Sequence, residues 1–196
     1  MNRVILLMLL ALIAARLPAR AGEPDPEGLI RPALLERALE AVQAHGQEEP
    51  ASGKLVVVDY SLHSSKQRLF VIDVETGAVS AYRTAHGLGS DPDHDGYLDS
   101  FSSQPGSEAT PQGVFRLAEA YQGRHGPSFR LDGLDETNRN TRARAIVVHS
   151  AWYAEPVFLD RRGKLGRSSG CIVFSKAELA RFADEAPVGT LIFMGR

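Results

Sequence analysis

Apolar side chains change their spacing along the chain, and these changes predict its elements. An unbroken apolar run covers residues 4–15. Residues 32–45 repeat apolar positions near the 3.6-residue period of an amphipathic helix, with Pro32 in the first turn and Gly46 after the end. From residue 54, short runs rich in Val, Ile, Phe and Tyr predict strands. The expected strands are Lys54–Tyr60, Arg68–Val74, Ala78–Thr84, Gly113–Ala118, Ser128–Asp132, Arg144–Ser150, Cys171–Phe174 and Thr190–Met194.

The order of these segments predicts a mostly β fold. The strands follow one another too closely for repeated βαβ units, so we expect a mixed β-sandwich or partly closed barrel with an N-terminal helix and one C-terminal helix. Ser175 and Glu178 form a capping box for the second helix, with Leu179 and Phe182 facing inward. Between the strands, the irregular stretch Ala85–Gln112 has the length of a functional or mobile loop.

The first segment has the pattern of a secretory signal. Arg3 precedes the apolar run, Pro18 ends it, and Ala19-Arg20-Ala21 has the small-x-small pattern of a cleavage site. The run is too short to cross a hydrocarbon core of ~30 Å as a helix, although an uncleaved anchor is the alternative. We therefore expect a signal peptide over residues 1–21, a leader and helix over 22–53, and a catalytic domain over 54–196. The protein would be secreted to the periplasm or cell envelope, and the mature chain would have no membrane span.

Composition narrows the possible functions. The chain has 22 Lys plus Arg against 24 Asp plus Glu, and 43% of its residues are hydrophobic, which indicates a soluble globular protein. No excess of positive charge is present to bind nucleic acid. Cys171 is the single cysteine, so no disulfide forms within the chain. In an oxidising compartment, a lone thiol is either buried and inert or retained for its chemistry.

Cys171 and His149 are the residues best suited to catalysis. Cys171 ends a Gly- and Ser-rich turn, in which Gly170 leaves room for a substrate carbonyl and successive backbone N–H groups can bind an oxyanion. Arg167 adds positive potential, which favours the thiolate. His149 ends a buried apolar run and can act as a base near neutral pH. Each residue taken alone is more often structural.

Together these residues resemble a known family. The run His149-Ser150-Ala151-Trp152-Tyr153 and the run from Gly163 to Cys171, which ends Gly-Arg-Ser-Ser-Gly-Cys, resemble the murein L,D-transpeptidase catalytic domain of the YkuD type. The closest pattern is a divergent branch with HGAWY before GRS-x-GC. Better-known members have His where this chain has Ser169, and Arg or Asn where it has Val173. Shorter matches occur at Ala85-His86-Gly87, Phe101-Ser102-Ser103, Gly106-Ser107 and Leu131-Asp132-Gly133-Leu134.

The resemblance implies a reaction and a set of residues. Cys171 would be the nucleophile and His149 its base in the transfer of a peptidoglycan stem peptide, with loss of terminal D-alanine and formation of a 3-3 cross-link. No cofactor is implied, and carbapenem-type β-lactams would acylate Cys171. The alternatives are an L,D-carboxypeptidase with water as acceptor, a non-catalytic peptidoglycan-binding domain, and a general cysteine protease. Gly170 and Ser169 are the candidates for the oxyanion turn, and the substrate-binding candidates are Arg167, Ser168, Ser150, Trp152, Tyr153, His86 and Ser103.

Metal binding is the less favoured interpretation of the remaining polar groups. Asp91, Asp93 and Asp95 with Gly96 match the start of a calcium loop, but its twelfth position is Ser102 rather than Glu, so a solvated acidic turn is preferred. No spacing marks a zinc site, for which His86, His94 and His149 would have to converge. A basic cluster, expected to be a solvated face, is formed by Arg139, Arg142 and Arg144.

Overall fold

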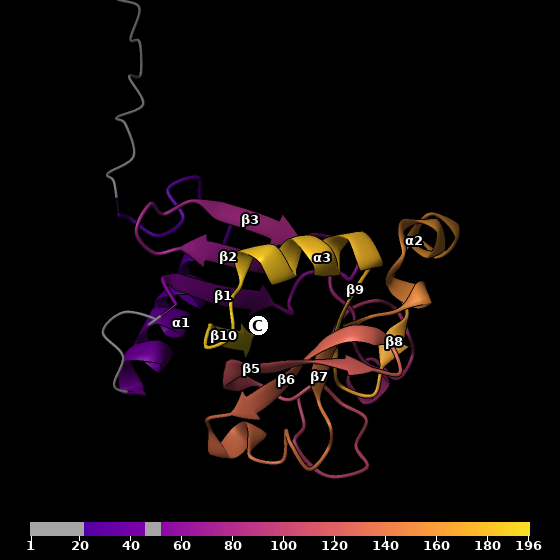
Figure 1. The fold of residues 1–196 in the computed structure, drawn as a ribbon. Helices are drawn as coiled ribbons and strands as arrows, with labels where there is room; N and C mark the ends of the chain where they lie inside the picture. Colours follow the sequence, from indigo (N-terminus) through magenta and orange to yellow (C-terminus); the bar gives the residue numbers. More distant parts are fainter. Residues whose placement is uncertain (1–21, 46–51) are drawn as a thin grey trace, which may run out of the picture.

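Strands dominate the structure, a computed structural model that describes residues 22–45 and 52–196. The strands of the main sheet are β1 (Lys54–Asp59), β2 (Leu69–Asp73), β3 (Val79–Tyr82), β5 (Gly113–Gly123), β6 (Gly126–Gly133), β7 (Val147–Ser150), β9 (Ile172–Phe174) and β10 (Leu191–Gly195). They form one eight-stranded sheet in the order β3-β2-β1-β10-β5-β6-β7-β9 (Figure 1). A separate two-stranded sheet joins β4 (His86–Gly87) to β8 (Arg167–Ser168).

Both expected helices are present, and a third was missed. Helix α1 covers Pro32–Ala44, and α3 covers Lys176–Glu185 after the expected cap, in which Ser175 Oγ accepts the backbone N–H of Glu178. The additional helix, α2 (Pro156–Arg162), buries none of its residues, so it has no apolar face from which the sequence pattern could predict it.

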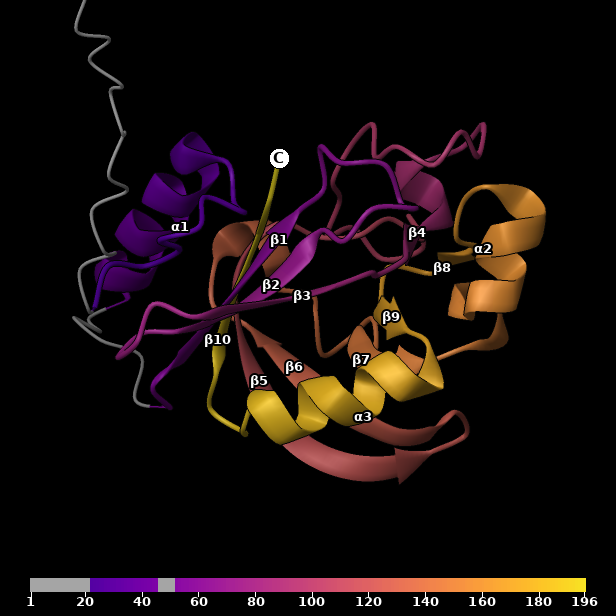
Figure 2. The same ribbon diagram turned by 90° about the horizontal axis from the view of Figure 1, so that it is seen from above.

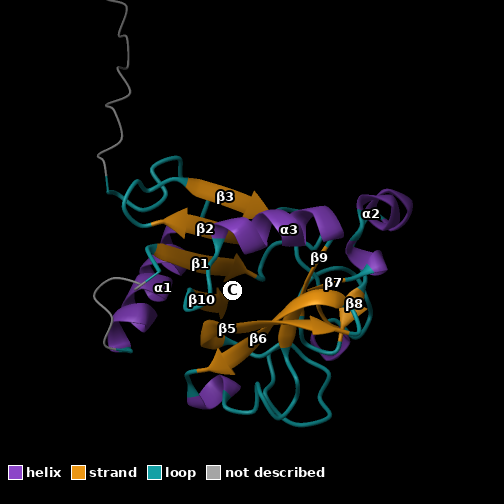
Figure 3. Cartoon of the chain, in the orientation of Figure 1, coloured by secondary structure: helices purple, strands orange, loops and turns teal. Residues whose placement is uncertain are grey.

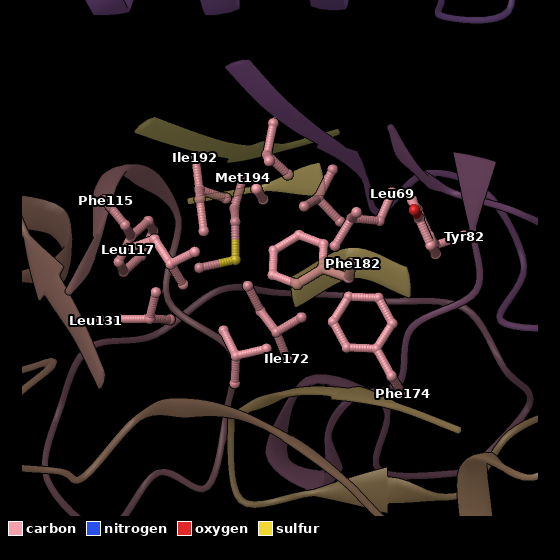
Figure 4. Close-up of a cluster of buried hydrophobic side chains, with 14 of the residues drawn as sticks. Leu69, Tyr82, Phe115, Leu117, Leu131, Ile172, Phe174, Phe182, Ile192 and Met194 are labelled. Atoms are coloured by element: carbon pink, nitrogen blue, oxygen red, sulfur yellow. The ribbon is translucent and has the colours of Figure 1, made fainter. Parts of the chain in front are cut away.

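The main sheet curls around α3 as a partly closed barrel, which decides between the two architectures expected from the sequence. Helices α3 and α1 lie on opposite faces of the sheet (Figure 2). On the inner face, Phe182 of α3 packs among buried side chains of β2, β3, β5, β6, β9 and β10 (Figure 4). An isolated antiparallel bridge pairs Val173 of the edge strand β9 with Ala85, which follows the other edge strand, β3, so the two ends of the sheet approach each other.

The N-terminal segment is fastened to the outer face of this sheet. Leu34, Ala38 and Val42 of α1 are buried in a second apolar cluster formed with β1, β2, β5 and β10. Arg31, directly before α1, donates two hydrogen bonds to the buried carboxylate of Asp59, at 2.6 and 3.0 Å. Helix α1 is therefore packed on the sheet that carries the site.

The stretch expected to be a flexible leader is partly ordered. Asp25 is 7% exposed, and its carboxylate accepts the backbone N–H groups of Leu29 and Ile30. The proposed signal peptide and most of the expected polar linker over 47–53 lie outside the described residues. Across residues 22–45 and 52–196, no helix combines the length and apolarity needed to cross a membrane. Loops gather beside β6, β7 and β8 (Figure 3), and the candidate site lies there.

Candidate active site

The pairing of β7 with β9 places Cys171 and His149 on one face of the sheet. The strands are parallel, with Val148 opposite Ile172 and His149 opposite Val173. Side chains alternate between faces along a strand, so Cys171 projects to the same side as His149. Val148 and Ile172 project to the opposite side, into the core around α3. The short strands thus hold Cys171 and His149 outside the core around α3 and two residues apart in register.

Both side chains line one cavity of about 730 Å³. Cys171 is half-buried and His149 is 4% exposed. The cavity wall has several arginines and no carboxylate, so it offers positive potential to a bound ligand. The wall consists of Leu88, Tyr121, Gly123, Arg124, His125, Arg144, Ala145, Val147, His149, Tyr153, Arg167, Ser168, Ser169 and Cys171.

The imidazole of His149 is held in the form of a base. Its Nδ1 lies 3.0 Å from the backbone carbonyl of Ser150, which can only accept, so Nδ1 carries the proton and Nε2 has a free lone pair. Burial lowers the pKa of His149 below its usual value, and the neighbouring side chains of His125 and Arg124 lower it further. The ring is therefore neutral at neutral pH.

The thiol of Cys171 is protonated at neutral pH. Burial raises the pKa of Cys171, and this effect outweighs the opposing influence of the Val147 backbone N–H and of the guanidinium groups of Arg144 and Arg124. The thiol donates weakly to the carbonyl of Ala145, with a sulfur–oxygen distance of 3.8 Å. The cavity therefore holds a protonated thiol and a neutral imidazole rather than a thiolate–imidazolium ion pair.

Arg167 was expected to favour the Cys171 thiolate, but it is not among the residues that lower the pKa of Cys171. Its guanidinium donates to the backbone carbonyl of Asp91 and so fastens the long loop to β8. The arginines that favour the Cys171 thiolate are instead Arg144 and Arg124. Arg167 still lines the cavity, and its role in binding substrate stays a prediction.

The turn before Cys171 is built differently from the expectation. Gly170 has a φ of +117°, and a Cβ there would lie 2.6 Å from the carbonyl oxygen of Ala109, so glycine leaves room for the neighbouring loop rather than for substrate. The Gly170 N–H donates to Ser168 Oγ at 3.1 Å, so it does not point to an oxyanion. Ser169 is exposed, with its hydroxyl 3.3 Å from a carboxylate oxygen of Glu108.

Arg144 connects this turn to the long loop, and the sequence interpretation missed its role. Its guanidinium donates to the backbone carbonyls of Ser102, Ala109 and Ser169, at 2.7, 2.7 and 3.3 Å. Arg144 is therefore the exception in the basic cluster, because Arg139 and Arg142 make the exposed ion pairs expected of a solvated face, with Glu136 and with Glu119 and Asp132. In the sequence, Arg144 stood out only as a member of the basic cluster and as the first residue of the expected strand Arg144–Ser150, and neither feature predicts these contacts.

The tip of the β5–β6 hairpin supplies a second group that the sequence did not reveal. Arg124 and His125 lie between the two strands and line the cavity. The ring of His125 is stacked on that of His149, with centroids 4.4 Å apart and an interplanar angle of 24°. No motif marks His125, because only the curvature of the hairpin brings it to β7.

The other residues predicted to bind substrate divide between three places. Ser150, Trp152 and Tyr153 line a larger adjoining groove of about 1110 Å³, and Tyr153 also lines the Cys171 cavity. Trp152 is 73% exposed. Ser168 lines the Cys171 cavity but donates to the carbonyl of Cys171 at 3.0 Å, which gives it a part in shaping the turn.

His86 and Ser103 are not in the wall of either cavity. His86 is 1% exposed, accepts from the guanidinium of Arg68 at Nδ1, and donates from Nε2 to Asp91, each at 2.9 Å. The hydroxyl of Ser103 lies 3.3 Å from the backbone N–H of Asn140, and its carbonyl accepts from the Asn140 side chain. Both residues stabilise the long loop in this structure.

Of the two sets of residues considered as metal ligands, the histidines lie apart and the aspartates lie together. The side chains of His86, His94 and His149 do not group together; His94 instead bonds the carbonyl of Leu165 at 3.1 Å. Asp91, Asp93 and Asp95 do bring carboxylate oxygens within 4.8 Å of one another. The carboxylate of Asp91 already accepts from His86 and from backbone N–H groups of the turn, as a structural acidic turn requires.

Comparison with known proteins identifies the family of this chain. The sequence matches the family model YkuD_2, described as the L,D-transpeptidase catalytic domain, over residues 27–194. A search of curated proteins found no match. Similar solved structures include an L,D-transpeptidase from Mycobacterium smegmatis, at 18% identity and a TM-score of 0.44, covering 74% of this chain and 59% of that one. L,D-transpeptidase 3 from Mycobacterium tuberculosis, in complex with a faropenem-derived adduct, has 14% identity and a TM-score of 0.45, with coverages of 74% and 60%.

This chain belongs to the L,D-transpeptidase catalytic-domain family, because the family model covers most of its length. The chain spans about three fifths of the length of these two solved relatives. Val173, at a position where better-known members have a polar side chain, is fully buried beside Ala85 and Leu165, so it cannot contact a substrate.

Proposed function

We propose that this protein is an exported L,D-transpeptidase that forms 3-3 cross-links in peptidoglycan through a Cys171 thioester. The observation that carries the proposal is the position of Cys171 and His149 on one face of β7 and β9, in one cavity, with Nδ1 of His149 occupied by Ser150. This arrangement leaves Nε2 of His149 as the group able to accept the thiol proton.

In the first half-reaction, Nε2 of His149 takes the proton from Cys171, and the sulfur attacks the carbonyl carbon that precedes the terminal D-alanine. The C–S bond forms, the amide C–N bond breaks, and protonated His149 gives its proton to the departing amine. Because the Gly170 N–H is used within the turn, the backbone N–H of Cys171 is the donor we assign to the oxyanion. An amine of a second stem then attacks the thioester, the C–S bond breaks, and the proton returns through His149 to the sulfur.

The charges of the cavity support an anionic peptide as donor. Arg124, Arg144 and Arg167 line it without a facing carboxylate. A stem peptide ends in a D-alanine carboxylate, which a positive cavity attracts and orients. A β-lactam also carries a carboxylate beside its reactive carbonyl, and a relative has been solved with a faropenem-derived adduct. We therefore expect carbapenems to acylate Cys171.

Product analysis by mass spectrometry tests the proposal. The purified protein is incubated with disaccharide-tetrapeptide, and a dimer formed with loss of D-alanine is expected. Cys171→Ala should form no dimer, and His149→Gln should reduce the rate by at least ~100-fold. His63→Gln is the matched control, because His63 lies on the loop after β1 and bonds Ser65 and Asp95. Tripeptide as the sole product would refute transfer in favour of hydrolysis, and unchanged substrate would refute catalysis.

This function also requires export, since peptidoglycan lies outside the cytoplasm. The basic start, apolar run and Ala19-Arg20-Ala21 pattern support cleavage after Ala21. Cell fractionation followed by N-terminal sequencing should find the mature protein in the envelope fraction, beginning at Gly22. A cytoplasmic protein that begins at Met1 would contradict this part of the proposal.

A further inference from the structure

The β5–β6 hairpin carries His125 across the face of the imidazole of His149. The two rings are nearly parallel, at 24°, with centroids 4.4 Å apart. His125 is exposed, whereas His149 is 4% exposed. His125 therefore covers one face of the histidine that the proposed function uses as its base.

Contacts within the hairpin hold His125 in this place. Arg124 Nε donates to His125 Nε2 at 2.9 Å, so the ring accepts at Nε2. Behind the tip, the guanidinium of Arg130 lies over the ring of Tyr121, 4.8 Å from its centroid. A register shift between Leu117 and Ala120 interrupts the β5–β6 pairing, and such irregularities bend a strand. The stacked geometry is thus supported from both strands of the hairpin.

We propose that His125 is a positioning residue for the base, holding the ring plane of His149 so that Nε2 remains directed to the Cys171 cavity. The hydrogen bond from Nδ1 to Ser150 fixes one edge of the imidazole, but a single bond allows the ring to tilt about it. Stacking on His125 restricts that tilt, because a planar neighbour at 4.4 Å limits movement of the ring toward it. The inference rests on the proposed function and adds a residue to it.

The stacking of His125 on His149 also affects the pKa of His149. The ionisable groups around His149 in this cavity are His125, Arg124 and Tyr121 from the hairpin, Arg144 from the segment before β7, Arg167 from β8, Tyr153 from the segment after β7, and Cys171. Burial is the largest cause that lowers the pKa of His149, followed among the lowering effects by His125 and Arg124. Removing His125 uncovers the ring of His149 to solvent, and the loss of burial raises the pKa of His149.

Two substitutions of His125 test whether it positions His149 or is an ordinary surface residue. His125→Ala removes the ring, whereas His125→Phe keeps a planar cover without charge. The matched control is His63→Ala, since His63 also packs edge-on against an aromatic ring, Tyr97, at 4.9 Å, but lies outside the Cys171 cavity. NMR titration of ¹³C-labelled histidine gives the pKa of His149 directly, and turnover of disaccharide-tetrapeptide against pH gives kcat and KM.

For His125→Ala, we expect the His149 pKa to rise by ~0.5 unit or more and kcat to fall about tenfold with KM little changed. His125→Phe should restore most of both values, and His63→Ala should alter neither. An unchanged His149 pKa and kcat in His125→Ala would overturn the inference, as would an equal loss in His63→Ala. If the wild-type protein forms no product, the proposed function fails, while the NMR titration still decides whether His125 controls His149.

Discussion

The guanidinium of Arg144 lies 2.7 Å from the carbonyl oxygen of Ala109, although 35 residues separate them in the sequence. The same side chain reaches Ser169, in the turn before Cys171. One cation thus joins the long loop to the turn before Cys171 by hydrogen bonds to carbonyl groups that no strand pairing satisfies.

Arg144→Ala should therefore loosen both segments at once. Loss of charged hydrogen bonds from a partly buried site is expected to lower the free energy of unfolding by about 1–3 kcal/mol. Carbapenem acylation of Cys171 should slow by about tenfold or more, because the thiol loses its fixed position. Thermal unfolding and intact-protein mass spectrometry measure the two effects. Arg142→Ala, which removes only the exposed pairs with Glu119 and Asp132, is the control and should change neither much.

Gly170→Ala is expected to be harmful for a steric reason. The new Cβ would lie 2.6 Å from the Ala109 carbonyl oxygen and 2.8 Å from Cδ1 of Ile146, at a φ of +117°. Gly189→Ala is the matched control, because Gly189 also has a positive φ, +97°, but no atom within 4 Å of its Cβ position. Backbone strain of about 1–2 kcal/mol is common to both variants. Only Gly170→Ala should lose further stability and slow acylation, and equal effects would show that backbone conformation alone matters.

The pH dependence of Cys171 acylation should report His149. Its pKa is lowered by burial, so the base stays neutral, and the rate stays high, as the pH falls through neutrality. The rate should then decline with a midpoint below 6.5, the usual pKa of histidine, when the ring is protonated. In His149→Gln this acidic limb should disappear, and a slow rate should rise only with ionisation of the thiol, whose pKa burial raises. A wild-type midpoint clearly above 6.5 would contradict a buried neutral base.

His86 should matter for acid stability rather than for chemistry. Burial, together with the nearby Arg68, lowers the pKa of His86 to about 4. Between pH 6.5 and that value, the unfolded chain binds a proton that the folded chain does not, so stability falls as the pH falls. His86→Gln should flatten the pH dependence of the unfolding midpoint over this window, as measured by calorimetry. It should also retain carbapenem acylation at neutral pH, whereas a large loss of acylation would restore the predicted substrate role of His86.

The elements that could be predicted from the sequence are those with a periodic apolar face. Helices α1 and α3 and the central strands were predicted because burial of one face determines their pattern. The distal half of β5 was missed, since Glu119, Ala120 and Gln122 are exposed in the hairpin that extends beyond the core. Helix α2 was missed for the same reason, as it buries no residue.

Some residues of the candidate site could be predicted from sequence motifs, whereas the roles of others depend on tertiary contacts. Cys171 and His149 were predicted from short motifs, and parallel pairing of their strands brings both to one cavity. Arg144 and His125 could not be predicted, because their roles depend on carbonyl groups and a ring contributed by distant segments. The expected oxyanion role of Gly170 failed because the Ser168 hydroxyl, whose direction no sequence pattern reveals, accepts its N–H.

The bridge between Ala85 and Val173 has a consequence for association between molecules. Strand β9 is an outer strand of the main sheet, and unpaired backbone groups on such a strand are a template for adding a strand from another chain. Here Ala85 occupies backbone groups of Val173, and the hydroxyl of Thr84 accepts the Val173 N–H at 3.1 Å. Strand β9, which follows Cys171, is thereby protected from intermolecular pairing, so the Cys171 cavity opens beside a sheet edge whose backbone groups at Val173 are already bonded within the molecule.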